Sequence, residues 1–125
     1  MIDTTNERFR EYVPEGWRAL FDELLINLEK VQPGFKIIDA KQKFGELRVY
    51  LKSGSSEAFQ LIDAATRSSR VTCEQCGQQG ALRSTNGYVQ SLCDEHAKPK
   101  SVVLEKSPIV ASFRATGGKL TRPER

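Results

Sequence analysis

The three cysteines and the only histidine of this chain lie within one window of 24 residues, as Cys73-x2-Cys76, a gap of 16 residues and Cys93-x2-His96. Two short ligand pairs separated by a loop of this length are typical of a structural Zn2+ site. A tetrahedral ion needs four ligands, and this set supplies four with no cysteine or histidine left over. The pattern therefore predicts one structural zinc ion held by these four side chains.

Two other interpretations of the four residues stay open, namely small core residues beside a surface histidine, and a redox-active C-x-x-C pair. A catalytic ion is disfavoured, because four protein ligands leave no position for water. The carboxylates nearest the ligands, Glu74, Asp94 and Glu95, are expected to be solvated. The chain also lacks phosphate-loop, dinucleotide-binding and nucleophile-elbow motifs. We therefore expect neither an active site nor a small-molecule substrate.

The length and the odd cysteine count set the broad class of protein. A chain of 125 residues has room for one compact domain. Three cysteines cannot all pair within one chain, and metal thiolates in a reducing compartment account for the odd number better than disulfides do. No apolar run approaches the ~18 residues of a membrane span, and the N-terminus has no signal-peptide pattern. We expect a cytoplasmic protein with no membrane partner.

Charge is unevenly distributed along the chain. Residues 98–125 hold seven basic and two acidic side chains, a net charge of +5, whereas residues 1–97 hold 12 basic and 14 acidic, a net charge of −2. A dedicated nucleic-acid-binding domain usually carries a basic face on its folded part. The balance favours a protein partner for the folded part, and the basic tail serves either solubility or contact with nucleic acid.

The first half of the sequence shows helical and strand periodicity in turn. Apolar residues recur at helical spacing over residues 17–31, and Pro33-Gly34 ends that helix. Strand character follows over 35–40 and again, with strict alternation, over 46–52, and residues 42–45 supply a turn between them, so we expect an antiparallel hairpin packed on the helix. A second helix is expected over residues 56–69, capped by Ser55 or Ser56.

The second half reads as a small metal module. Cys73–Gly77 has the pattern of a zinc knuckle, and Asn86-Gly87 is a strong signal for a two-residue hairpin turn. If Cys93 and His96 occupied the first turn of a helix, both would face one ion. Knuckle, hairpin and ligand-bearing helix predict a treble-clef-like module, and a zinc ribbon is the alternative.

The predicted organisation is an α+β fold of helix, β-hairpin and helix, followed by the treble-clef-like or zinc-ribbon module, in one compact domain. Residues 1–70 form the α/β-hairpin body, 71–97 the structural zinc module, and 98–125 a basic, partly disordered tail that lends one strand to the body. Within the tail, apolar patches at 102–104 and 109–111 are the candidates for that strand, and disorder is expected past about residue 114.

A candidate partner surface lies on the two hairpins. Basic side chains interleaved with aromatic ones can hold a nucleic-acid backbone and stack bases, and they also suit a protein partner. The plainer interpretation is the solvated outer face of a two-stranded sheet, with lysines protecting its edge. The residues concerned are Lys41, Lys43, Arg48, Tyr50 and, on the zinc hairpin, Arg83.

Several strings of the sequence resemble a group of small bacterial and phage-encoded zinc-ribbon or treble-clef-like proteins. The strings are Gly16-Trp17, K-F-G-E-L-R-V-Y at 43–50, R-S-S-R at 67–70, C-E-Q-C-G at 73–77 and L-C-D-E-H-A at 92–97. The resemblance covers residues 16–97 and implies a zinc-bound fold in a bacterial or phage setting, with no catalytic residues carried over. We expect a non-enzymatic binding protein, such as an inhibitor, immunity protein, antitoxin or regulatory adaptor. The alternative is a nucleic-acid-binding zinc protein that uses the 36–52 hairpin and the basic tail.

Overall fold

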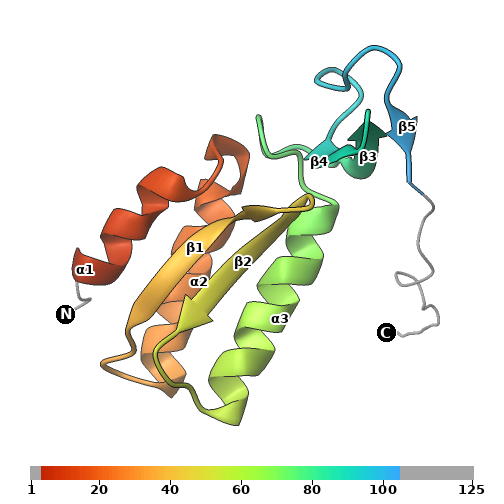
Figure 1. Ribbon diagram of the computed structural model, residues 1–125. Coiled ribbons are helices and arrows are strands. Elements are labelled where there is room, and N and C mark those ends of the chain that lie inside the picture. Colours follow the sequence, from red (N-terminus) through yellow and green to blue (C-terminus); the bar gives the residue numbers. More distant parts are fainter. Residues whose placement is uncertain (1–3, 105–125) are drawn as a thin grey trace.

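The computed structural model describes residues 4–104, and their side chains from residue 6 onward. The predictions for residues 105–125, including the apolar patch at 109–111 and disorder past residue 114, lie outside the described residues. Figure 1 shows the order of the elements along the chain. They are α1 (Thr4–Glu7), η1 (Arg8–Tyr12), η2 (Glu15–Trp17), α2 (Arg18–Val31), β1 (Ile37–Lys43), β2 (Glu46–Leu51), α3 (Ser56–Arg70), β3 (Ala81–Thr85), β4 (Tyr88–Leu92) and β5 (Val102–Val103).

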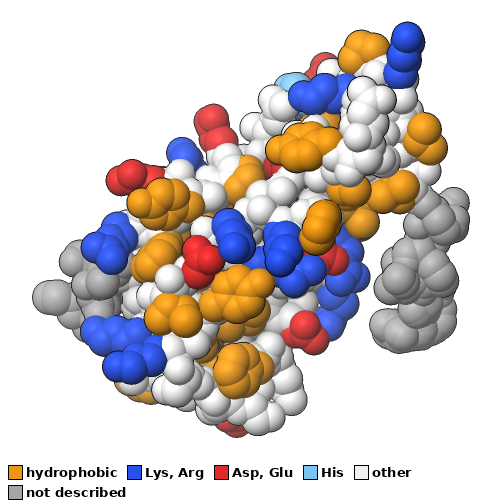
Figure 2. Space-filling view, in the orientation of Figure 1, with side chains coloured by type: hydrophobic (Ala, Val, Ile, Leu, Met, Phe, Trp, Pro, Cys, Tyr) orange, Lys and Arg blue, Asp and Glu red, His pale blue; other side chains and the backbone are white. Residues whose placement is uncertain are grey.

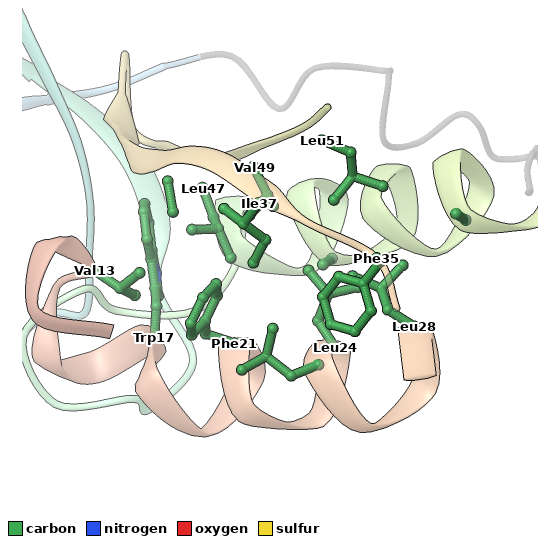
Figure 3. Close-up of a cluster of buried hydrophobic side chains, with 14 residues drawn as sticks. Val13, Trp17, Phe21, Leu24, Leu28, Phe35, Ile37, Leu47, Val49 and Leu51 are labelled. Atoms are coloured by element: carbon green, nitrogen blue, oxygen red, sulfur yellow. The ribbon is translucent and has the colours of Figure 1, made fainter. Parts of the chain in front are cut away.

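The body has two layers, with the β1–β2 hairpin on one side and the helices α2 and α3 on the other (Figure 1). Side chains at helical spacing along α2 point into the space under the hairpin, where alternate side chains of β2 meet them (Figure 3). Burial of a large apolar side chain contributes about 1.5–3 kcal/mol, so this cluster accounts for most of the body's stability. Its largest members are Trp17, Phe21, Leu28, Phe35 and Leu47.

The turn of the first hairpin is shorter than predicted. The sequence suggested a turn over residues 42–45, but β1 continues to Lys43, and Phe44 and Gly45 alone connect the strands. Both have positive φ, 53° and 80°, which is the backbone of a two-residue type I′ turn. The prediction missed this because phenylalanine seldom adopts a left-handed conformation.

Helix α3 packs along β2 and covers the outer edge of that strand at Leu47. Its N-cap is Ser55, whose side chain accepts a hydrogen bond from the N–H of Ala58 (3.1 Å), as the sequence suggested. Near its other end, the Ser69 hydroxyl accepts from the Leu47 N–H (2.8 Å) and the Thr66 hydroxyl donates to the Leu47 carbonyl (2.8 Å). The helix therefore satisfies backbone groups that a two-stranded sheet would leave exposed at this position.

The second half forms a three-stranded antiparallel sheet in the order β4-β3-β5. Asn86 and Gly87, with φ of 54° and 85°, make the predicted turn between β3 and β4. The short strand β5 comes from the first apolar patch of the tail, but it pairs with β3 of this second sheet and not, as the sequence had suggested, with the body. Among the described residues, no helix has both the length and the apolar character needed to cross a membrane.

The helix expected to begin at Cys93 does not form. Residues 94–96 make a single turn, in which the His96 N–H donates to the Cys93 carbonyl (3.2 Å). From there to residue 104 the described chain contains turns and β5 but no helix. Pro99 explains part of the difference, because the residue before a proline is disfavoured in the helical region. The small mixed domain is confirmed, whereas the treble-clef-like arrangement is not.

Candidate metal centre

The first ligand pair lies in a tight turn directly after α3. The Gly77 N–H donates to the Cys73 carbonyl (2.9 Å), and the Cys73 N–H donates to the Gln78 carbonyl (2.7 Å). Gly77 has φ +84°, a conformation that glycine adopts without strain. The turn brings Cys73 and Cys76 to the same side, with Cys73 buried and Cys76 exposed.

The second pair follows β4, and the turn at 93–96 returns His96 toward Cys93. The Cys76 and Cys93 sulfurs are 3.7 Å apart, and His96 Nδ1 lies 3.6 Å from the Cys73 sulfur and 3.3 Å from the Cys93 sulfur. All four ligand atoms lie within 4.8 Å of one another. The structure therefore brings together the four predicted ligand residues in a Cys3His cluster that could hold one metal ion.

The turn around Cys73 favours a negatively charged sulfur at that residue. Burial raises the pKa of the Cys73 thiol, but backbone N–H groups of Cys93, Cys76 and Gln75 together lower it to about 6. At Cys76 the backbone hydrogen bond from Gln78 lowers the pKa, but desolvation and the sulfurs of Cys93 and Cys73 outweigh it, so the pKa is raised. Hydrogen bonds to the sulfurs of Cys93 and Cys73 raise the pKa of His96. A thiolate is the form of cysteine that binds metal, so the turn at Cys73 is already arranged for a cation.

The knuckle rests directly on the beginning of α2. The Gly16 N–H donates to the Glu74 carbonyl (2.7 Å), and the Trp17 indole donates to the Thr72 carbonyl (2.8 Å). A Cβ atom at Gly16 would lie 2.1 Å from the Cys73 carbonyl oxygen, so no side chain fits there. The Gly16-Trp17 pair is thus a docking point for the metal module.

The tip of the first hairpin provides a second contact with the module. A Cβ atom at Gly45 would lie 2.5 Å from a methyl carbon of Leu82 and 3.1 Å from one of Val89, both on the β3–β4 hairpin. Gly45 is buried although it lies in a turn. The metal module therefore contacts the body at the Gly16-Trp17 pair and at this turn.

A buried carboxylate lies between these contacts. The sequence suggested that Glu74 is solvated, but it is 7% exposed, and this expectation is wrong. Its two oxygens accept hydrogen bonds from the side-chain amides of Gln42 (3.0 Å) and Gln90 (2.6 Å). The three residues come from β1, the knuckle and β4, and no local pattern signals their meeting. Asp94 and Glu95 are exposed, as expected.

Four of the five predicted surface residues share one face. In the β1–β2 register Lys41 lies opposite Arg48, while Lys43 and Tyr50 lie two residues farther along their strands. We call the outer surface of the β1–β2 hairpin, away from α2 and α3, the hairpin face. Figure 2 shows basic, acidic and hydrophobic side chains mixed over this surface. Its exposed apolar and basic members are Ile38, Lys41, Lys43, Phe44 and Tyr50, and Arg48 is half-buried on the same face.

Arg83 does not join the hairpin face. Its side chain is 12% exposed and bonds to the Leu92 carbonyl (2.9 Å) and the Asp94 carboxylate (2.8 Å). These bonds fix the end of β4 beside Cys93, so Arg83 supports the metal cluster from the adjacent strand.

Comparisons of the chain with models of protein families, with curated proteins and with solved structures find no match.

Proposed function

We propose that the Cys3His cluster binds one structural Zn2+ ion. With Zn–S bonds of about 2.3 Å and Zn–N bonds of about 2.0 Å, tetrahedral geometry gives sulfur–sulfur separations of about 3.8 Å and sulfur–nitrogen separations of about 3.5 Å. Three of the six separations between ligand atoms, 3.7, 3.6 and 3.3 Å, are close to these values, and all six lie within 4.8 Å. Each ligand pair is carried by a turn, which supports a ribbon-like zinc module.

A structural role is supported by the closed ligand set. Three sulfurs and one imidazole nitrogen fill a tetrahedron, so the ion has no position for water or substrate. The only buried hydrophobic cluster of the described module consists of Cys73, Leu92 and Cys93, and two of these are ligands. An ion at this position would replace the apolar core that the module lacks.

We further propose that the chain is a non-enzymatic binding protein whose hairpin face contacts another protein. The observation that carries this proposal is the exposure of apolar and aromatic side chains on a sheet that helices back on one side only. Ile38 is 60%, Phe44 65% and Tyr50 39% exposed. Aromatic side chains combined with arginine are typical of protein interfaces. Because helices support the sheet from behind, these side chains are already held in place before a partner binds.

Nucleic acid remains the second candidate, because Lys43 lies over the Phe44 ring and Tyr50 is on the same face. However, two of the four basic or aromatic residues predicted here are paired with acids, Lys41 with Asp39 (3.3 Å) and Arg48 with Glu46 (2.7 Å). Binding to a phosphate backbone relies on uncompensated cations. Gel-shift titrations across salt would support nucleic acid only if binding falls steeply with salt.

The proposed cellular setting rests on the resemblance to small bacterial and phage proteins and on the three free cysteines. A zinc-stabilised domain with reduced cysteines suits a cytoplasm. We therefore propose a bacterial or phage inhibitor, immunity protein, antitoxin or adaptor. This assignment stays a prediction.

The proposal is tested by capturing a partner from native bacterial lysate with the zinc-loaded chain and with two variants. Ile38→Ser and Phe44→Asn remove apolar surface from the hairpin face, and asparagine suits the positive φ at residue 44. Tyr12→Ser, which changes a residue 64% exposed on η1, is the matched control. We expect the first two variants to lose a protein that the control retains. Equal capture by all four chains, or no captured protein, would contradict the proposal.

A further inference from the structure

A groove with a volume of about 330 Å³ runs between β2 and α3, beside the hairpin face. Figure 1 shows the two elements side by side along the body. The groove is at the small end of the range of about 300–1,000 Å³ that ligand pockets occupy. Its walls include Arg48, Val49 and Tyr50 from β2, and Ile62, Thr66 and Arg70 from α3.

The inner wall carries one uncompensated positive charge. The Glu46 carboxylate, with its side chain 13% exposed, contacts both Arg48 and Arg70. One carboxylate balances only one of these two guanidinium groups. Asp63 also lines the groove, and its charge is balanced by Arg67, which lies 3.3 Å away one turn farther along α3. Each guanidinium has five N–H donors, and Glu46 accepts from only some of them.

Backbone groups also face this groove. Because antiparallel pairing alternates, β2 residues two apart direct their N–H and C=O groups to the same edge. Those of Leu47 point away from β1 and bond to Ser69 and Thr66 of α3. The groups of Val49 therefore point the same way, into the groove. Among the hydrogen bonds of the described residues, none joins Val49 to a side chain of α3.

We propose that this groove binds a short extended peptide segment of a protein partner through one acidic side chain. The peptide backbone bonds to Val49 as an added strand would, and its Asp or Glu carboxylate contacts Arg48 and Arg70. Tyr50 and Ile62 provide apolar contact for the flanking side chains. This inference rests on the proposed function, because it specifies the partner that the neighbouring hairpin face would contact.

The charge favours a carboxylate over a phosphate. A single surplus positive charge matches one monoanion, whereas a phosphate group carries about −1.5 to −2 charges at neutral pH and would lie near Glu46. A nucleic-acid strand would also place successive phosphates along a surface where Lys41 and Arg67 are already paired. An acidic peptide is therefore the occupant that the groove fits.

The test is an NMR titration of the full zinc-loaded chain with the blocked peptide Ac-Val-Thr-Glu-Thr-Val-NH2. The matched probe replaces its glutamate with glutamine, and two further probes carry phosphoserine at that position or are a thymidine oligonucleotide. We expect the Val49 amide and the Nε–H signals of Arg48 and Arg70 to shift, with about fivefold or greater preference for glutamate over glutamine. Arg48→Gln should abolish the preference, whereas Arg10→Gln, at an exposed ion pair on η1, should retain it.

Three outcomes would overturn the inference. These are equal affinity for the glutamate and glutamine peptides, stronger binding of the phosphoserine peptide or the oligonucleotide at the same signals, and absence of shifts at Val49 and the two arginines. The proposed function fails separately. Suppose that Ile38→Ser and Phe44→Asn abolish partner capture while the glutamate peptide leaves the groove signals unchanged. That result supports partner binding by the hairpin face and contradicts only the inference about the groove.

Discussion

The body and the metal module are held together by different physical means. The body buries 14 hydrophobic residues in one cluster, and they lie on η2, both long helices, the first hairpin and the connecting positions Val13 and Phe35. The described part of the module buries only Cys73, Leu92 and Cys93 in its cluster, although its β3–β4 hairpin pairs without the register shift that β1–β2 has between Ile37 and Asp39. The difference supports the proposal that a bound ion supplies, for the second hairpin, the stabilisation that an apolar core supplies for the first.

Removal of the metal should produce the largest difference in stability between the two regions, because it should unfold the module and leave the body folded. Structural zinc contributes on the order of 10 kcal/mol to folding of comparable small modules, far more than any single hydrogen bond. We predict that a chelator, or Cys93→Ser, exposes the amides of residues 72–104 to rapid hydrogen exchange and leaves α2 and most of α3 protected. Hydrogen exchange with mass spectrometry measures this. Simultaneous loss of protection in both regions would show that the body needs the ion.

A cavity made in the core of the body should have the opposite effect. It should destabilise the body and leave the zinc content of the folded protein unchanged. Phe21 is fully buried in the main cluster, so Phe21→Ala should cost about 3–5 kcal/mol of the free energy of unfolding. Denaturant unfolding followed by circular dichroism gives that value. Zinc stoichiometry in the folded protein should be unchanged, because Phe21 belongs to the body cluster. Ile26→Ala, at an exposed position of the same helix, is the control and should cost less than about 1 kcal/mol.

The contact between the regions can be tested at Gly16. Gly16→Ala places a Cβ atom against the Cys73 carbonyl, where rigid backbone has to move, and we predict a loss of about 2–4 kcal/mol together with weaker zinc binding. Gly34→Ala is the matched control, since its Cβ would meet nothing within 4 Å and only its positive φ is unfavourable. The control should cost about 1 kcal/mol with zinc affinity unaltered. Competition with a zinc-binding dye compares the two affinities.

The smallest expected effect comes from the buried carboxylate. Glu74→Gln keeps the shape but puts an amide N–H2 group where one of two glutamine amides now donates, so we predict a loss of about 1–2 kcal/mol. Glu95→Gln, on the exposed turn between the second ligand pair, should be neutral. Thermal unfolding of both variants measures the difference. Equal melting temperatures would mean that the Glu74 hydrogen bonds contribute little.

Local patterns predicted much of this structure. The stripe of apolar residues gave α2, the alternation at 46–52 gave β2, and Asn86-Gly87 gave the turn of the zinc hairpin. The ligand set could be predicted because a tetrahedral site needs four ligands and the chain has only four cysteine and histidine side chains. Each of these features depends on residues close together in sequence, where propensity and spacing act directly.

The features that sequence analysis missed depend on distant contacts. The burial of Glu74 requires Gln42 and Gln90, which are 32 and 16 residues away. Arg83 looked like a surface cation until its strand brought it to Asp94. The turn at Phe44-Gly45 is held against Leu82, a residue of the other sheet. Tertiary packing decides such positions, and a single sequence carries no pattern for it.

The coordination of the bound ion tests the central claim most directly. X-ray absorption of the purified chain, combined with native mass spectrometry, determines the metal content and the atoms bonded to the ion. We predict one zinc per chain with three sulfur ligands at about 2.3 Å, one nitrogen at about 2.0 Å and no water. An oxygen ligand from an exchangeable water, or a metal-free chain whose residues 72–104 remain protected from exchange, would contradict the account.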